Sequence, residues 1–285
     1  MSLAKKRLPG WIIVHGWGAF GCERKCLMRS EIRLIASDID GTLLRDGALE
    51  IAPEIFEHIR RLARKGILFC PASGRQYQSL RKLFTPVADR LPFLCENGAV
   101  VYGPGSPGPV WSKTVMDRPL AEALSRDIMA LPGAEVLISG ANTSYLCPKG
   151  ADFEAHIRWF TGNNICRVPA PEEVPEEMVK VSAYCPGTLE EVQEALCPKW
   201  EQHFHAAVAG AAWLDFTLAD KGSGLARLCE ILEISPGQVM AFGDNFNDVP
   251  MLSLAGRPYI MDTAHPQLKQ RFSVCSGVDK ILERL

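Results

Sequence analysis

The stretch that most constrains this chain is the pentapeptide Asp38-Ile39-Asp40-Gly41-Thr42, which directly follows the apolar segment 32–36. The apolar segment is short and ends in a turn-like sequence, which predicts a buried β-strand. Asp-x-Asp alone is typical of a solvated turn, but two carboxylates at the exit of a buried strand require a charge partner. A divalent cation is such a partner, because hard cations prefer carboxylate and carbonyl oxygens. Gly41 permits a sharp turn, and Thr42 adds a hydroxyl donor.

The composition describes an ordinary globular protein. The 285 residues are enough for two domains, with 47% hydrophobic residues, 22% charged residues and a net charge of −2. This charge balance does not indicate a nucleic-acid or membrane partner, and no apolar segment approaches the roughly 20 residues that cross a bilayer. Ten cysteines occur without a CxxC pair, which suits a reducing cytoplasm. Residues 1–30 lack periodicity, and we expect an N-terminal extension that is disordered or non-native.

A strand–helix–strand unit follows the pentapeptide. Residues 53–65 have apolar side chains at helical spacing between Pro53 and Gly66, and residues 67–70 form a second apolar strand. The connection predicts two parallel strands that end at the same edge of the sheet. Ser73, which follows the second strand, is therefore expected beside Asp38. Taken alone, Ser73 is also an ordinary helix N-cap.

The middle of the chain changes character. A third short strand, 92–95, precedes Glu96-Asn97-Gly98-Ala99, which is locally also typical of a hairpin turn. Residues 113–217 then interrupt the alternation of strands and helices. Two helices are predicted there, at 119–131 and 189–196. Strands are predicted at 136–138, 179–184, 205–208 and 213–218. We interpret this segment as an α+β insertion.

The last part of the chain returns to the α/β pattern. Lys221 begins a predicted helix, where a cation opposes the helix dipole, so its position points to an anionic ligand. The apolar strand 239–242 then ends in a second polar cluster that contains Asp244, Asn247 and Asp248. Carboxylate and amide groups again follow a buried strand at the predicted carboxyl edge.

These motifs, in this order, resemble those of the haloacid dehalogenase (HAD) superfamily. Motif I is Asp38–Thr42, motif II is Ser73, motif III is Lys221, and motif IV is the GDxxND sequence that begins at Gly243. The turn 96–99 is similar to that of Cof-type phosphatases. The resemblance covers residues 31–285. It implies a doubly wound, Rossmann-like parallel sheet at 31–112 and 218–285, with a C2-type α+β cap domain inserted at 113–217.

The resemblance also implies the roles of individual residues. The implied catalytic residues are Asp38 as nucleophile, Asp40 as general acid and base, and Lys221 as the charge-stabilising group. The implied phosphate-binding residues are Asp38, Thr42, Ser73, Gly74, Lys221 and Asn247. The implied Mg²⁺ ligands are Asp38, Asp40 (through its carbonyl), Asp244 and Asp248.

The expected function is Mg²⁺-dependent hydrolysis of small phosphomonoesters, such as sugar phosphates or similar metabolites, through an aspartyl-phosphate. A phosphosugar mutase with the same intermediate and a non-catalytic metabolite-binding protein on the same fold are the alternatives. The expected partner is a small phosphorylated metabolite; the oligomeric state is left open, and a monomer is compatible with the sequence. One sequence departs from the family pattern: Met261-Asp262-Thr263-Ala264 replaces the common Met-Gly-Asn-Ala. Asp262 could either face solvent or repel an anionic substrate.

Overall fold

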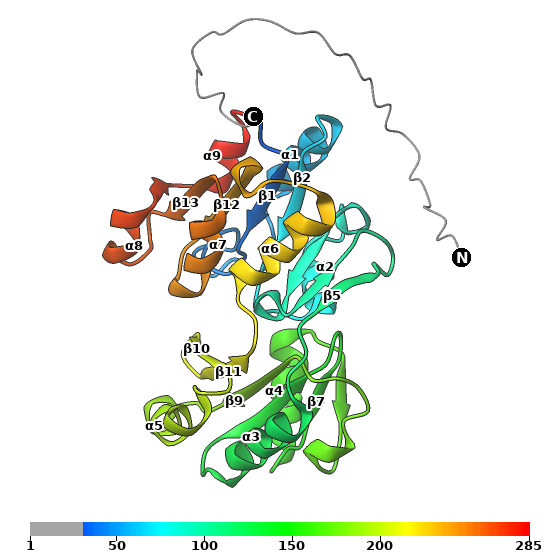
Figure 1. Ribbon diagram of the computed structural model, residues 1–285, viewed down its shortest axis with the longest axis vertical. Coiled ribbons are helices and arrows are strands. Elements are labelled where there is room, and N and C mark those ends of the chain that lie inside the picture. Colours follow the sequence, from blue (N-terminus) through cyan, green and yellow to red (C-terminus); the bar gives the residue numbers. More distant parts are fainter. Residues whose placement is uncertain (1–30) are drawn as a thin grey trace, which may run out of the picture. The chain divides into compact units, whose positions relative to one another are not determined.

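Five parallel strands form the central sheet, in the order β14-β13-β12-β1-β2 (Figure 1). The computed structural model describes residues 31–285, so the expectation for residues 1–30 lies outside the described part of the chain. The strands are β1 (Leu34–Ser37), β2 (Leu68–Pro71), β12 (Val239–Gly243), β13 (Arg257–Met261) and β14 (Ser273–Cys275). The predicted strands before Asp38, Ser73 and Asp244 are thus neighbours in one sheet.

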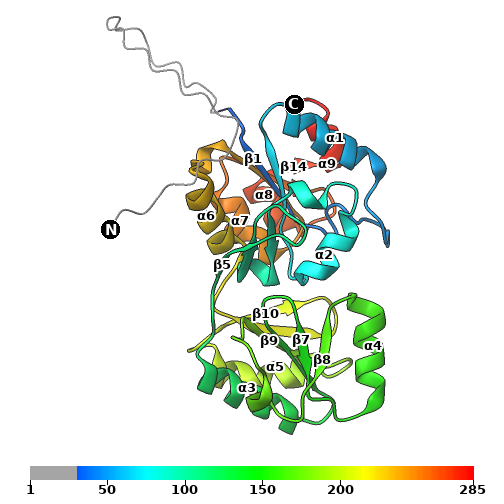
Figure 2. The ribbon, with the colours of Figure 1, turned by 90° about the vertical axis from the view of Figure 1, so that its right-hand side faces the viewer.

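Helices cover both faces of this sheet, as a doubly wound fold requires. Helices α1 (Pro53–Arg64) and α9 (Val278–Leu282) pack together on one face (Figure 2). On the other face lie α6 (Lys221–Leu232), α7 (Val249–Leu254) and α8 (Pro266–Arg271). The sheet is apolar on both sides: Ile35 belongs to the first cluster, whereas Leu34 and Ala36 belong to the second. This explains why the strands are continuous apolar runs.

A three-stranded antiparallel sheet adjoins β2 through a single parallel bridge between Ala72 and Leu94. Its strands are β3 (Phe93–Cys95), β4 (Val100–Tyr102) and β5 (Val110–Lys113), and α2 (Tyr77–Leu83) packs beside it. The turn between β3 and β4 holds Glu96, Asn97 and Gly98 at φ of 51°, 54° and 93°. These left-handed conformations suit Asn and Gly. The turn contacts the segment that follows β2, because the N–H of Asn97 donates to the carbonyl of Ser73 at 3.0 Å.

The second large sheet has six strands in the order β10-β11-β9-β6-β7-β8. The strands are β6 (Glu135–Ser139), β7 (Ser144–Leu146), β8 (Ile165–Arg167), β9 (Lys180–Tyr184), β10 (His205–Ala209) and β11 (Trp213–Thr217). All strand pairs are antiparallel except β7 with β8. Helices α3 (Arg118–Ala130) and α5 (Leu189–Trp200) pack on one face, and α4 (Ala151–Thr161) follows β7. The whole sheet lies within the predicted insertion 113–217.

The predicted elements agree with the structure to within a few residues, and the fold class is confirmed. Five short 3-10 helices were not predicted: η1 (Ala88–Arg90), η2 (Glu96–Gly98), η3 (Pro171–Glu173), η4 (Pro236–Gln238) and η5 (Phe246–Asp248). The strands β4, β5, β7, β8, β13 and β14 were also missed, and so were the helices α2, α4, α7, α8 and α9. Among residues 31–285, no helix is long and apolar enough to span a membrane.

Candidate active site

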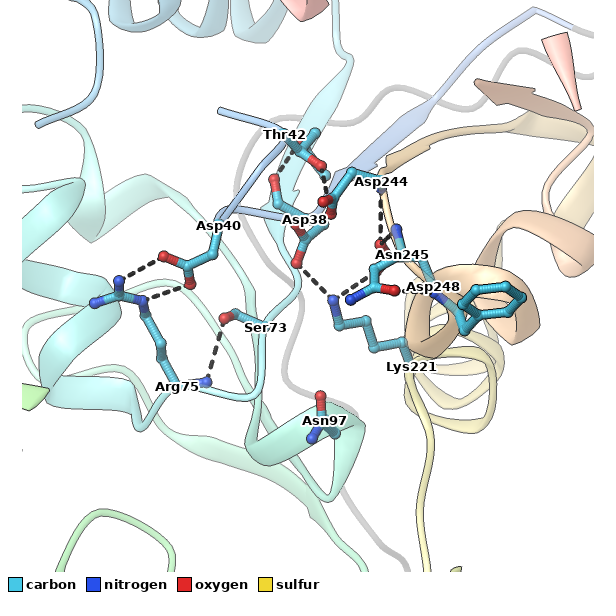
Figure 3. Close-up of polar contacts among 12 residues, drawn as sticks. Asp38, Asp40, Thr42, Ser73, Arg75, Asn97, Lys221, Asp244, Asn245 and Asp248 are labelled. Carbon is cyan, nitrogen blue, oxygen red and sulfur yellow. Dashed lines mark hydrogen bonds and ion pairs between the residues drawn. The ribbon is translucent and has the colours of Figure 1, made fainter. Parts of the chain in front are cut away.

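Three carboxylates meet at the carboxyl edge of the central sheet. Strands β1 and β12 are adjacent, with Ser37 paired to Phe242, so the segments that follow them leave the sheet side by side. One carboxylate oxygen from each of Asp38, Asp244 and Asp248 lies within 4.8 Å of the other two (Figure 3). The two motifs, about 200 residues apart in the sequence, therefore form one acidic cluster.

Gly41 allows the first motif to approach the second. Its φ is 89°, and a Cβ atom there would overlap the carboxylate of Asp244. Glycine is therefore required both by the backbone conformation and by the space available. Thr42 contributes to the same contact, because its Oγ1 donates a hydrogen bond to Oδ1 of Asp244 at 3.4 Å.

Lys221 lies at the centre of the cluster. Its Nζ donates to Oδ1 of Asp38 at 2.6 Å and to Oδ1 of Asp248 at 2.5 Å, and its side chain is 1% exposed. Burial lowers the pKa of Lys221, but the charges of Asp248 and Asp38 outweigh it and hold this pKa above the ordinary value. A protonated lysine is thus fixed beside the predicted nucleophile.

Asp248 fixes the turn that carries the second motif. Its Oδ2 accepts hydrogen bonds from the backbone N–H groups of Asp244 at 2.9 Å and Asn245 at 3.1 Å. Its other oxygen binds Lys221, so the fully buried carboxylate joins the backbone turn to the lysine. Three hydrogen bonds offset the cost of burying this charge.

The acidic cluster fits a divalent cation. Burial raises the pKa of Asp38 well above its usual range, and the charge of Asp248 raises it further despite Lys221. Burial and Asp248 likewise raise the pKa of Asp244 to about 6. The Oδ2 atom of Asp38 is buried without a hydrogen-bond partner. Three carboxylates thus face one lysine, and Mg²⁺ would relieve their repulsion through the oxygen donors that it prefers.

The cluster opens into a cavity of about 580 Å³. Ser73 and Gly74 line it beside Asp38 and Lys221, and the exposed Asn247 lines it from η5. The buried Oγ of Ser73 accepts a hydrogen bond from the backbone N–H of Arg75 at 3.2 Å, which orients the hydroxyl. The structure therefore brings five of the six predicted phosphate-binding residues to one cavity, and their role remains a prediction. Thr42 is the exception, because it is buried, does not line the cavity and donates its hydroxyl to Asp244.

Asp40 points away from the acidic cluster and binds Arg75, a residue to which the sequence analysis gave no role (Figure 3). The guanidinium donates from Nε to Oδ2 of Asp40 at 2.8 Å and from Nη2 to Oδ1 at 2.6 Å. The carboxylate is therefore held by a bidentate pair at the cavity wall. The signal was available, because Arg75 follows Ser73 at the same strand exit. A metal contact through the Asp40 carbonyl remains a prediction.

A second buried lysine, Lys180 on β9, was also missed. Its Nζ lies 2.6 Å from Oε2 of Glu96 and 3.5 Å from Oδ2 of Asp215, and it donates to the carbonyl of Gly74 at 3.1 Å. Asn97 adds a hydrogen bond from Nδ2 to Asp215 at 3.3 Å. These contacts join the β3–β4 turn to the six-stranded sheet. The only sequence signal was a charged residue within the mostly apolar predicted strand 179–184.

Asp262 faces Arg45 rather than the cavity. Oδ1 of Asp262 accepts from Nη2 of Arg45 at 2.7 Å, and both side chains are partly exposed. Asp262 does not line the cavity. The departure from the family pattern therefore forms a surface ion pair, and the position is compatible with an anionic substrate.

Comparison with known proteins agrees with this geometry. Residues 35–279 match the family described as haloacid dehalogenase-like hydrolase. The chain is 25% identical to the 5-amino-6-(5-phospho-D-ribitylamino)uracil phosphatase of Escherichia coli (strain K12), covering 88% of this chain and 97% of that one. It is 28% identical to the HMP-PP phosphatase of Cronobacter sakazakii, covering 83% and 86%. A solved structure from Eubacterium rectale has a TM-score of 0.80 and 30% identity, covering 89% and 98%.

The fold and the site define an α/β enzyme with a buried lysine and three carboxylates at the carboxyl edge of a parallel sheet. The chain belongs to the haloacid dehalogenase-like hydrolase family. This membership confirms the predicted family and the predicted enzyme class, a HAD-like phosphomonoester hydrolase.

Proposed function

We propose that this chain is a Mg²⁺-dependent phosphatase that hydrolyses small phosphomonoesters, among them phosphorylated sugars or polyols, through an aspartyl-phosphate on Asp38. The observation that carries the proposal is the position of Asp38. Lys221 holds one of its oxygens at 2.6 Å, while the other oxygen is buried without a hydrogen-bond partner in a residue that lines the cavity. A carboxylate that is oriented through one oxygen is suited to attack phosphorus through the other.

The remaining residues supply the other parts of phosphoryl transfer. Asp38 forms the bond to phosphorus as the bond to the leaving oxygen breaks, and Asp40 gives its proton to that oxygen. Asp40 then takes a proton from the water that hydrolyses the aspartyl-phosphate. In this proposal the phosphoryl oxygens are held by Lys221, Ser73 and the backbone at Gly74. The support for it is that all three residues line the cavity with Asp38.

Asp38, Asp244 and Asp248 would hold the Mg²⁺, together with the carbonyl of Asp40. When bound, Mg²⁺ supplies positive charge that lets an anionic nucleophile and an anionic phosphate approach each other. Arg75 must release Asp40, or move with it, before the carboxyl group can reach a leaving oxygen.

We further propose that residues 113–217 act as the C2-type cap that selects the leaving group. The six-stranded sheet in this segment supplies the cavity wall opposite Asp38, including Lys180, Tyr184 and Trp213. The core motifs meet only the phosphate end, so discrimination between leaving groups must come from other residues. A cytoplasmic location remains a prediction, and the oligomeric state stays open.

The test is release of inorganic phosphate from a panel of esters with Mg²⁺ present. The panel contains hexose phosphates, ribitol 5-phosphate, p-nitrophenyl phosphate and the phosphorylated ribitylamino-uracil named for the similar E. coli enzyme. We expect turnover that excess EDTA abolishes and that Asp38→Asn reduces to near background. Isomerised ester without phosphate release would instead identify a mutase. Binding without turnover would identify a non-catalytic metabolite-binding protein.

A further inference from the structure

The cavity extends well beyond the phosphate end. Lys180, Ser182 and Tyr184 alternate along β9, so all three lie on the face that lines the cavity. Lys180 contacts Gly74 next to Ser73, whereas Tyr184 lies four residues further on, about 13 Å along the strand at about 3.3 Å per residue. A hexose monophosphate places its ring next to the phosphorus, so it would leave the far end of this wall uncovered.

Aromatic side chains form that far end. The Tyr184 ring lies 4.8 Å from the ring of Trp213 and 5.0 Å from the ring of His156, measured between centroids. Tyr184 and Trp213 are directly opposite residues on β9 and β11. All three rings are half-buried and line the cavity, so part of their surface faces it. We call Tyr184, Trp213 and His156 the aromatic platform.

The hairpin between β10 and β11 continues the apolar surface. Residues 208–213, Val-Ala-Gly-Ala-Ala-Trp, all line the cavity, and Val208 is 43% exposed. A turn at the surface is usually polar, so six consecutive apolar residues beside a cavity favour an apolar ligand surface. The platform and the hairpin are therefore two observations that point to the same kind of ligand.

Between the two ends the wall is polar. Oγ of Ser182 donates to Oδ1 of Asp215 at 2.7 Å, and Asp215 also accepts from Asn97. The Oδ1 atom of Asn97 is buried and has no hydrogen-bond partner. Such an acceptor suits a ligand group that donates a hydrogen bond, as a hydroxyl does. The order along the cavity is thus an anion site, an acceptor region and an aromatic region.

From this order we infer that the preferred substrate is a phosphorylated polyhydroxy chain that ends in a planar heteroaromatic ring. The phosphate lies at Asp38, the hydroxyl groups lie along Asn97 and Asp215, and the ring stacks on the aromatic platform. This inference rests on the proposed phosphatase function and specifies its leaving group. Every planar heteroaromatic ring has a π face, so stacking tolerates different ring types. The aromatic platform therefore specifies that the substrate carries a planar ring but does not specify the substituents of that ring.

The experiment compares ligands that differ only in the ring. The Asp38→Asn variant, which leaves the ester uncleaved, is titrated with ribitol 5-phosphate, with flavin mononucleotide and with a ribityl phosphate that carries one pyrimidine ring. We expect at least one ring-bearing ester to bind about tenfold or more tightly than ribitol 5-phosphate. Adding Trp213→Ala or Tyr184→Ala should remove most of that difference. Trp213→Phe, which retains a π face, should keep much of it.

Two controls make the result decisive. Val274→Ala truncates an exposed apolar side chain on β14, away from the cavity, and should leave the ring preference intact. If an alanine variant fails to fold, Trp213→Leu keeps apolar volume without a π face and should still lose the preference. The inference is overturned if both ring-bearing esters bind no tighter than ribitol 5-phosphate, or if folded Trp213 and Tyr184 variants keep the full preference. The phosphatase proposal is tested by a different measurement, and it fails if the wild-type protein releases no phosphate from any ester.

Discussion

The two buried lysines provide an instructive comparison. Lys221 lies between Asp38 and Asp248, and Lys180 lies between Glu96 and Asp215. In both, burial lowers the lysine pKa, and two carboxylates more than compensate, so the pKa is held above the ordinary value.

The lysines differ in what they connect. The partners of Lys221 all follow strands of the central sheet, whereas Lys180 joins the β3–β4 turn to the six-stranded sheet. A buried, charged lysine therefore does not by itself indicate catalysis. Its position beside a nucleophile at the carboxyl edge does.

Apart from loss of the nucleophile Asp38, the largest effect is expected at Asp40, which lies outside both lysine clusters. Asp40→Asn should lower kcat by about 10²–10⁴-fold, because the amide cannot transfer the proton. Steady-state phosphate release measures this. Asp46→Asn, an exposed neighbour in the same loop, should remain near wild type. An Asp40→Asn enzyme within tenfold of wild type would show that proton transfer belongs to another group.

The next prediction separates the two lysines. Lys221→Met should lower kcat by about 10²–10³-fold, since it removes a charge held beside the nucleophile. Lys180→Met should instead act mainly on stability. It leaves Glu96 and Asp215 buried without their cation, which costs about 3–5 kcal/mol of unfolding free energy. Its kcat at a temperature where it is folded should fall less than tenfold.

Denaturant unfolding and phosphate release on the same two proteins check this contrast. The division of roles fails if Lys180→Met loses activity as strongly as Lys221→Met while remaining folded. It also fails if Lys180→Met is as stable as wild type, because the cluster would then contribute nothing to joining the two sheets.

The same contrast shows how far the sequence could be read. Four site residues were predictable because each lies at or just after the end of a strand or begins a helix, and therefore reaches a known edge of the sheet: Asp38, Ser73, Lys221 and Asp244. The sequence could not predict which side chains of β9 and β11 line the cavity, namely Lys180, Tyr184 and Trp213. Alternate residues of a half-exposed strand cannot be assigned to a cavity until the surface that they face is known. The position of Arg75 near Asp40 could be predicted, because Arg75 follows Ser73 at the same strand exit. Their bidentate pairing could not, since it depends on side-chain conformation rather than on strand order.

Mg²⁺ binding should depend on pH, and this dependence should come from the acidic cluster rather than from the Lys180 cluster. Asp244 has a pKa of about 6 against an ordinary value of 3.8, so the metal-free folded state binds the extra proton. Its contribution to stability is present at low pH and is lost as pH rises through about 6. Mg²⁺ must displace this proton at pH 5, so its apparent Kd should be at least about tenfold weaker at pH 5 than at pH 7. The raised pKa of Asp38 in the same cluster acts in the same direction. Calorimetric titration measures the Kd.

Glu96→Gln, in the Lys180 cluster, should show the same pH dependence as wild type, because Glu96 is not part of the acidic cluster. Equal Mg²⁺ affinity at pH 5 and pH 7 in wild type would contradict the placement of Asp244 at the cation. If Glu96→Gln lost the pH dependence, the titrating group would belong to the Lys180 cluster and not to the acidic cluster.

The smallest effect is expected at Asp262, the departure from the family pattern. Asp262 forms an ion pair with Arg45 in which the two side chains are 43% and 26% exposed. Exposed pairs contribute about 0–1 kcal/mol, so Asp262→Asn should change the unfolding free energy by no more than about that amount. Because Arg45 offsets its charge and Asp262 does not line the cavity, kcat/KM should stay within about twofold for every ester. Comparing singly and doubly phosphorylated esters checks this. A rise of several-fold confined to the more anionic ester would show that Asp262 repels substrate, and would extend the electrostatic reach of the site beyond the Lys221 cluster.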